Sequence, residues 1–367
     1  MTLPEGRLLA ALRLARTPGV GPVSWRRLVG RHGSPEAALA ALPETLRAAG
    51  GKIPAIPGEA AALHELARLQ RLGATPLILG DPHYPPRLAA LADAPAVLAV
   101  TGDAARLAAP AVALVGARNA SAGGLRLAGS IAGDLAAAGI AVISGLARGI
   151  DAAAHRAVLA GTGTTIAVIA GGLDRPYPPE HAALQAEIAA NGAVLAEMPP
   201  GISPEARHFP RRNRIIAGLA LGVVVVEAAL RSGSLITARL AADAGREVFA
   251  VPGSPLDPRA RGANALLRDG AVLCENAADV LAVLGGVGTR IPAAQGQEAA
   301  AGPTAEPMAE AGLIERVASL LGSAPLPLDE VLRQAEAPAP LVLAALLDLE
   351  LAGRAVAEGM GYARAAG

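Results

Sequence analysis

Three arginines within four residues stand near the start of a predicted helix, directly behind an aromatic ring. The segment HFPRRNRIIAGLA contains Phe209, Arg211, Arg212 and Arg214. Pro210 suits the first position of a helix, where its missing N–H removes no hydrogen bond. The free N–H groups and the dipole of a helix start attract anions. Arginines, free amides and an aromatic ring together can hold a nucleic-acid backbone and stack on an unpaired base.

A solvated basic helix start without a ligand is the simpler interpretation, and the position of the helix argues against it. Residues 223–226, which follow, are four consecutive valines. An unbroken apolar run of this length is typical of a buried strand in a parallel sheet. Ligands of such sheets bind beyond the carboxyl ends of the strands, so a ligand site is expected near this helix.

Several predicted strands end in a polar turn that contains glycine. These turns read VGARNAS, ISGLARGID and VEAALRSGSLITAR. Taken singly each is weak, because a glycine after a strand is often only a turn and a serine there can be only a helix cap. Together they predict an anion-binding rim of guanidinium groups, hydroxyls and backbone amides along one edge of the sheet. Its members are Arg118, Ser144, Gly145, Arg148, Gly233 and Ser234.

The sequence shows no pattern for catalysis at this rim. It has no G-x-x-x-x-G-K-[ST] phosphate loop, no dinucleotide fingerprint and no His/Cys spacing typical of a metal site. Neither His155 nor His208 has an obvious nucleophile partner, and we assign Asp151 and Glu227 to capping or to pairing with rim arginines. We therefore expect anion binding without catalytic residues, metal or cofactor.

Composition sets further bounds. The 367 residues suffice for two or three domains, and the formal net charge is zero, so affinity for nucleic acid must come from a local patch. Hydrophobic residues make up 52% and aromatic residues 2% of the chain, which predicts an aliphatic core. The single cysteine, Cys274, excludes an intrachain disulfide. Without a signal-peptide pattern or a membrane-length apolar run, we expect a cytoplasmic protein.

Four segments differ in their patterning. Residues 1–80 predict a helical domain similar to SAM or helix–hairpin–helix domains, with TPGVGP as the turn. Residues 81–284 alternate strands and helices, which predicts an α/β fold with an extended Rossmann-like, doubly wound and mostly parallel sheet. Residues 285–310, rich in Gly, Ala and Pro, predict a flexible linker. Three helical patterns and a hairpin in residues 311–367 predict a winged-helix domain.

Five motifs, in this order, resemble the DprA/Smf family of bacterial DNA-processing proteins. They read VALVGARNAS, VISGLARGIDAAAHRAVL, GGLDRPYPPEH, HFPRRNRIIAGLA and VVVVEAALRSGSLITARLAADAGREVFAVPGSP. The resemblance implies an extended Rossmann domain that binds and protects single-stranded DNA independently of sequence. It also implies a homodimer and a role in loading the RecA recombinase during natural transformation.

The resemblance further implies which residues contact DNA, and Arg212 joins them on the charge argument. Those that match the family's DNA-contacting turns are Arg118, Ser144, Gly145, Arg148, Phe209, Arg211, Asn213, Arg214, Gly233 and Ser234. One feature departs from a DNA-binding pattern. The third helical pattern of the winged helix, 340–351, has no basic residue and carries Asp348 and Glu350. A helix that follows phosphates should be basic, so we do not expect this domain to bind DNA.

Two other function classes remain as alternatives. A nucleotide phosphoribohydrolase of the lysine-decarboxylase-like group has a related fold, but its P-G-G-x-G-T-x-x-E signature does not fit. The segment AGGLDRPYPPE lacks the G-T and misplaces the acid. The other alternative is a structural adaptor that acts only through its flanking domains, which would show no salt-dependent binding of oligonucleotides.

Overall fold

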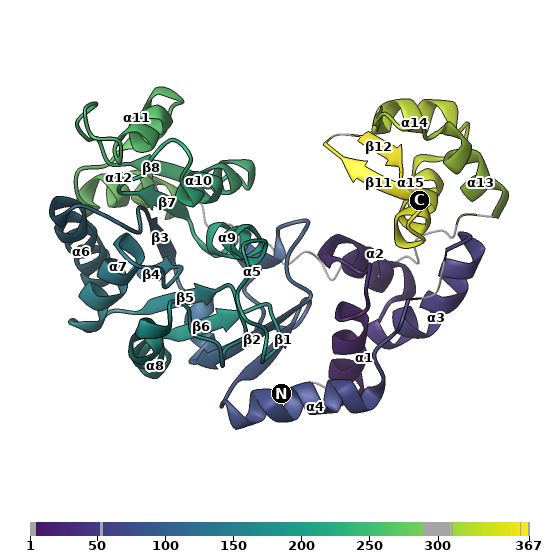
Figure 1. Ribbon diagram of the computed structural model, residues 1–367, viewed down its shortest axis with the longest axis horizontal. Coiled ribbons are helices and arrows are strands. Elements are labelled where there is room, and N and C mark those ends of the chain that lie inside the picture. The colour runs from purple at the N-terminus through teal and green to yellow at the C-terminus, as the bar shows by residue number, and fades with distance from the viewer. Residues whose placement is uncertain (1–4, 52–53, 289–308, 310, 360, 366–367) are drawn as a thin grey trace. The chain divides into compact units, whose positions relative to one another are not determined.

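The computed structural model describes residues 5–51, 54–288, 309, 311–359 and 361–365 (Figure 1). The chain divides into two compact units, one of residues 65–294 and the other of residues 1–64 and 295–367. Of the linker predicted at 285–310, residues 285–288 belong to the end of a helix, and all others except 309 lie outside the described residues.

The strands described in the 65–294 unit form one nine-stranded sheet in the order β1-β2-β6-β5-β4-β3-β7-β8-β9. Their bounds are β1 Thr75–Ile78, β2 Val97–Gly102, β3 Ala111–Val115, β4 Ala141–Ser144, β5 Thr165–Ile169, β6 Ala193–Ala196, β7 Gly222–Val225, β8 Glu247–Ala250 and β9 Val272–Leu273. Neighbours from β6 to β9 pair in parallel, whereas β1 with β2 and β2 with β6 are antiparallel. The mostly parallel, doubly wound sheet is confirmed.

Helices cover both faces of this sheet (Figure 1). One face carries α6 (Ala122–Ala137), α7 (Ile150–Leu159), α8 (Ala182–Asn191) and α12 (Ala277–Gly288), and the other carries α5 (Pro86–Ala89), α9 (His208–Leu219), α10 (Gly233–Asp243) and α11 (Arg261–Arg268). Alternate residues of one strand belong to different cores: Val112 and Leu114 to the α6 side, Ala113 and Val115 to the α9 side. Burial on both faces explains why the strands are apolar throughout.

One segment of the predicted helical region 5–80 is a strand. β1 pairs with β2 at the edge of the sheet and buries Leu77 and Ile78. Pro76 is compatible with this position, because an edge strand can leave one N–H unused. We expected the N-terminal domain to extend to residue 80. The end of α4 (Glu59–Arg71) and all of β1 instead belong to the 65–294 unit.

The other unit joins the two ends of the chain. Its elements are α1 Glu5–Ala15, α2 Pro22–His32, α3 Pro35–Ala48, α13 Ala311–Leu320, α14 Leu328–Gln334 and α15 Ala339–Leu351, with a three-stranded sheet in the order β10 (Leu326–Pro327), β12 (Gly361–Arg364), β11 (Ala355–Glu358). Three helices and an antiparallel hairpin confirm the winged helix. Trp25 is buried in α2 and its Nε1 donates to the carbonyl oxygen of Ala11 at 3.4 Å, so it is a core residue.

The acidic residues of α15 contact the N-terminal helices. Arg31 Nη1 of α2 donates to Asp348 Oδ1 at 2.6 Å, and both side chains are buried. Arg31 Nη2 also donates to the carbonyl oxygen of Ala344 at 3.2 Å. Glu350 lies 4.0 Å from Arg27. Burial raises the pKa of the Asp348 and Glu350 carboxyls above their usual range, and the nearby arginines oppose this. The two acidic residues on which we based the expectation that this domain does not bind DNA therefore serve the contact of α15 with α2.

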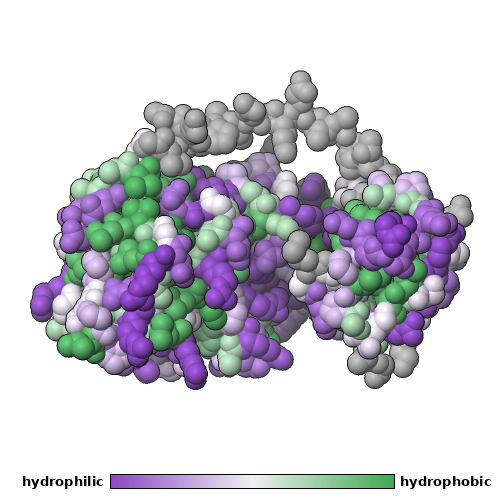
Figure 2. Space-filling model, turned by 90° about the horizontal axis from the view of Figure 1, so that it is seen from above, coloured by the Kyte–Doolittle hydropathy of each residue, from purple (hydrophilic) through white to green (hydrophobic). Residues whose placement is uncertain are grey.

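The surface drawn in Figure 2 is neither uniformly hydrophilic nor uniformly hydrophobic. On the face drawn in Figure 2, hydrophilic residues are interspersed with hydrophobic ones over the coloured parts of both units. Among the described residues, no helix is both long and apolar enough to cross a lipid bilayer. With a formal net charge of zero, an anion site in this chain has to be a local feature.

Candidate nucleic-acid interface

A pocket opens at the carboxyl ends of β3 and β7, where the order of the sheet reverses. Such reversal points are where doubly wound sheets bind their ligands. The pocket has a volume of about 190 Å³ and is lined by Val115, Gly116, Arg118, Ala147, Asp151, Phe209, Arg212, Asn213, Ser232, Gly233, Ser234 and Thr237.

Six of the residues expected to contact DNA line this pocket, and they come from the turn after β3 and from the starts of α9 and α10. These six are Arg118, Phe209, Arg212, Asn213, Gly233 and Ser234. The other five, Ser144, Gly145, Arg148, Arg211 and Arg214, are not among the lining residues. The predicted rim is thus divided into groups that face the pocket and groups that do not.

Arg118 and Phe209 contact each other. The guanidinium carbon of Arg118 lies 5.1 Å from the centroid of the Phe209 ring. At this distance the ring quadrupole attracts the cation. A cation and an aromatic ring, the two kinds of group that can bind a phosphate and stack on a base, therefore lie side by side.

The Phe209 ring also contacts Tyr177, which sequence reasoning missed. The two ring centroids are 5.6 Å apart and the ring planes are inclined by 65°. Tyr177 lies after β5 in GGLDRPYPPEH, one of the five motifs of the family resemblance, in which we gave the tyrosine no role. The sequence did contain a signal that could have identified Tyr177. Aromatic residues make up only 2% of this chain, so a tyrosine in a polar turn is unusual.

The start of α10 forms another wall. The Ser232 hydroxyl caps the helix by accepting from the Ser234 N–H at 3.3 Å, and the two hydroxyl oxygens lie 2.6 Å apart. Asn213 Nδ2 donates to the carbonyl oxygen of Gly233 at 3.3 Å, which ties α9 to this turn. The hydroxyls and the positive end of the helix suit an anion.

Arg212 lines the pocket but is mostly buried beneath it. Its Nη2 donates to the carbonyl oxygen of Gly145 at 3.0 Å. A Cβ at residue 145 would lie 1.7 Å from Arg212 Nη1, so a larger residue here would have to displace the Arg212 guanidinium. Burial lowers the pKa of Arg212 to about 10, and the nearby Asp151 opposes the shift. Arg212 therefore shapes the turn after β4 in addition to supplying charge.

Asp151 holds the same turn from its other side. It is buried and accepts the backbone N–H groups of Gly145 at 3.1 Å and Ala147 at 3.3 Å. Burial raises the pKa of the Asp151 carboxyl, while Arg212 and the two backbone hydrogen bonds lower it. This geometry supports the capping role that we expected for Asp151.

Arg211 and Arg214 share one acidic partner but differ in exposure. Helix α9 begins at His208, two residues before the expected start. Arg214 Nη2 lies 2.6 Å from Glu197 Oε1, and both side chains are buried, at 8% and 10% exposure. The Arg211 side chain is 51% exposed and its Nη2 lies 3.5 Å from the same oxygen. Of these two, Arg211 is the one with an accessible guanidinium.

Ser144 and Arg148 are also engaged within the protein. Ser144 is fully buried and its hydroxyl donates to the carbonyl oxygen of Leu114 at 2.6 Å, linking β4 to β3. Arg148 is exposed and forms an ion pair with Glu180 at 2.5 Å. The exposed ion pair with Glu180 leaves Arg148 accessible to a ligand, whereas the Ser144 hydroxyl is not.

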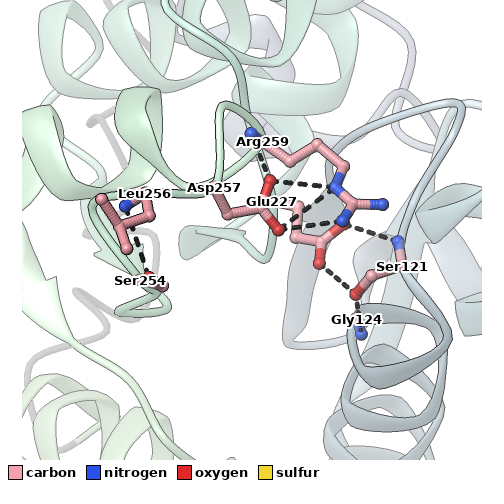
Figure 3. A network of polar contacts seen from close by, with 7 residues as sticks. All are labelled: Ser121, Gly124, Glu227, Ser254, Leu256, Asp257 and Arg259. Atoms are coloured by element: carbon pink, nitrogen blue, oxygen red, sulfur yellow. Dashed lines mark hydrogen bonds and ion pairs between the residues drawn. The ribbon is translucent and has the colours of Figure 1, made fainter.

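Glu227 lies in the turn after β7 and holds the turn after β3 through hydrogen bonds with Ser121 (Figure 3). Its two carboxylate oxygens accept the Ser121 hydroxyl at 2.5 Å and the Ser121 N–H at 2.9 Å. The Ser121 hydroxyl in turn accepts the Gly124 N–H at 2.9 Å, which makes Ser121 the N-cap of α6. A Cβ at Gly124 would lie 2.6 Å from the Glu227 carboxyl carbon. Glu227 therefore holds this turn in place.

The histidines are poorly placed for proton transfer. His155 is fully buried and its Nδ1 lies 2.7 Å from Thr165 Oγ1. Burial, with a smaller effect of Arg212, lowers the pKa of His155 to about 3, so the ring is neutral at ordinary pH. His208 is buried and its Nδ1 accepts the Glu205 N–H at 3.1 Å. Within the described ranges, no three His, Cys, Asp or Glu side chains are grouped to hold a metal ion.

Comparison with known families identifies all three segments of the chain. The model of the DNA recombination-mediator protein A family matches residues 75–285. Those of the DprA-like N-terminal HHH domain and the DprA winged helix domain match residues 5–67 and 299–359. Protein Smf of Escherichia coli is 41% identical over 289 residues, which are 77% of this chain and 75% of that protein. DNA processing protein DprA of Streptococcus pneumoniae is 46% identical over 202 residues, 55% of this chain and 71% of that protein.

Solved structures agree with these matches. The X-ray structure of DprA from Streptococcus pneumoniae aligns with a TM-score of 0.64 and 35% identity, covering 77% of this chain and 98% of that chain. DNA processing protein A from Helicobacter pylori, solved to study its single-stranded DNA binding mode, aligns with a TM-score of 0.52 and 31% identity. That alignment covers 57% of this chain and 95% of the other.

Proposed function

Because the chain belongs to the DNA recombination-mediator protein A family, we propose that it binds single-stranded DNA in the pocket at the ends of β3 and β7. The observation that carries this proposal is the contact between Arg118 and the Phe209 ring beside the capped start of α10. A guanidinium and a helix start suit a phosphate, and the ring suits its base. The single-stranded DNA binding mode of the Helicobacter pylori relative supports the same conclusion.

Binding at this pocket is independent of sequence and favours single strands. Guanidinium groups, hydroxyls and amides contact the backbone, which is the same for every nucleotide. Every base has a flat face for an aromatic ring, but a base pair inside a duplex hides that face. A strand with unpaired bases therefore gains the contact with Phe209, and a duplex does not.

We propose further that the protein is a cytoplasmic homodimer that protects incoming DNA and helps load the RecA recombinase during natural transformation. Family membership supports these steps, which depend on partner proteins. The winged helix takes no direct part in DNA binding in this proposal, because α15 contacts α2 through Arg31 and Asp348.

The first prediction concerns salt. The logarithm of the association constant for labelled oligothymidine should fall linearly with the logarithm of the salt concentration, with a slope of about −0.7 per phosphate contacted. Arg118→Ala should weaken binding and flatten this slope, because it removes a charge that lines the pocket. Fluorescence anisotropy at several salt concentrations measures both effects. Arg126→Ala, which removes an exposed arginine of α6 that is not among the lining residues, is the matched control. Equal slopes for the two variants would place the DNA elsewhere.

The second prediction concerns chemistry. We expect no nuclease, ATPase or nucleosidase turnover on prolonged incubation with magnesium, because Asp151 and Glu227 are both engaged in holding turns. Neither carboxylate is placed to activate water while it accepts backbone N–H groups. A turnover that survives repurification and disappears in Asp151→Asn or Glu227→Gln would show an enzyme instead. Base release from a nucleoside monophosphate would specifically favour the phosphoribohydrolase alternative.

A further inference from the structure

The aromatic residues of this chain are distributed unevenly between core and surface. There are six in all, and each lies in the described part of the chain. Four of them, Trp25, Tyr84, Phe249 and Tyr362, are buried. The remaining two, Phe209 and Tyr177, are the pair whose rings touch. A single exposed ring needs no explanation, but here both accessible rings of the chain meet beside Arg118.

Tyr177 has little structural reason for its position. Its side chain remains 43% exposed in a turn after β5, so its contact with Phe209 buries only part of the ring. No hydrogen bond of its hydroxyl is found among the described residues. A ring placed this way contributes little to the core and keeps accessible surface that a ligand could contact.

We propose that Tyr177 is a second base-stacking residue of the site and that the site holds two successive bases splayed apart. This inference rests on the proposed function. The Phe209 and Tyr177 ring planes are inclined by 65°, so two bases that stack on them cannot remain stacked on each other. The strand must turn between the two bases. Arg175, two residues before Tyr177 and 53% exposed, adds a cation to the same turn.

The bend that the DNA strand must make between the two bases determines which strands bind best. A strand whose neighbouring bases stack strongly must lose that stacking before it can enter, whereas a weakly stacked pyrimidine strand loses little. Preferences of this kind come from base stacking and backbone flexibility and not from hydrogen bonds to the bases. The site therefore accepts any single strand but modestly favours flexible, pyrimidine-rich ones, and oligothymidine should bind more tightly than oligodeoxyadenosine of equal length.

The test replaces Tyr177 in the full chain and measures anisotropy with both oligonucleotides. Loss of one stacked base is worth roughly 1–3 kcal/mol, so Tyr177→Ala should weaken oligothymidine binding by about 5- to 150-fold. The ratio of the affinity for oligothymidine to that for oligodeoxyadenosine should also be smaller in Tyr177→Ala than in the unaltered chain. Tyr177→Phe should bind as the unaltered chain does, because the ring remains. The salt slope should not change in either variant, since no charge is removed.

Two further variants separate stacking from structure. Tyr177→Leu keeps an apolar side chain without a planar ring and should lose affinity as the alanine variant does. Leu256→Ala removes a 90% exposed apolar side chain from the same unit and should have no effect. If Phe209→Ala weakens binding while Tyr177→Ala and Tyr177→Leu bind normally, the second stacking position is overturned and the proposed function stands. If the unaltered chain does not bind oligothymidine, the proposed function itself fails.

Discussion

Arg214→Ala should destabilise the 65–294 unit by roughly 3–5 kcal/mol, although Arg214 belongs to the basic cluster of α9. Its guanidinium lies 2.6 Å from Glu197 Oε1, and neither side chain is more than 10% exposed. Removal of the arginine leaves a carboxylate buried at the end of β6 with one poorly placed partner, Arg211 at 3.5 Å. An uncompensated buried charge is among the most costly single changes in a protein. Chemical denaturation with hydrogen exchange in α9 and β6 measures the loss.

Arg211→Ala is the matched control for this variant. The two arginines lie on one helix and face the same carboxylate, but the Arg211 side chain is 51% exposed. Exposed ion pairs contribute about 0–1 kcal/mol, so the stability should remain almost unchanged. Removal of an accessible cation should instead reduce the salt slope by about 0.7 if Arg211 contacts one phosphate. A stable Arg214→Ala variant with a reduced slope would assign the phosphate contact to Arg214 and contradict this division of roles.

Arg31→Ala should destabilise the unit of residues 1–64 and 295–367 by a similar amount, roughly 3–5 kcal/mol. Asp348 accepts from Arg31 at 2.6 Å with both side chains buried, so the variant leaves a carboxylate inside the contact between α2 and α15. Trp25, the only tryptophan, is buried in the same helix α2. Its fluorescence during denaturation of the full chain therefore reports on this unit.

The neighbouring pair provides the control for this second prediction. Arg27 and Glu350 join the same two helices at 4.0 Å, with 33% and 23% of their side chains exposed. Arg27→Ala should therefore cost no more than about 1 kcal/mol. The double variant Arg31→Met, Asp348→Leu should recover most of the lost stability, because no charge remains to be buried. If Trp25 fluorescence shows the same unfolding transition for Arg31→Ala and for the unaltered chain, the buried pair of Arg31 and Asp348 contributes nothing to the stability of this unit.

The sequence determined the architecture because its patterns are local. Apolar runs such as 223–226 already required burial on both faces, and the strand–helix alternation required a parallel sheet. The turns after β3 and β4 and before α10 could be named in advance, because glycine, serine and arginine follow the strands directly. The acidic pattern of 340–351 likewise argued against a phosphate-tracking helix before its partner was known.

Only the tertiary structure decided which of these polar side chains are accessible and which are buried in contacts within the protein. Arg211 and Arg214 are three residues apart and chemically identical, yet beside the Glu197 carboxylate, directly after β6, the fold buries Arg214 and leaves Arg211 half exposed. The Ser144 hydroxyl donates to a carbonyl oxygen of β3 and is not available to a ligand. The rings of Tyr177 and Phe209 are in contact although the two residues are 32 positions apart in the sequence. Charge and hydrogen-bonding capacity belong to a residue type and can be read from the sequence. Desolvation and pairing depend on neighbours that the fold brings from distant parts of the chain, and these decide whether a charge stabilises the protein or binds its ligand.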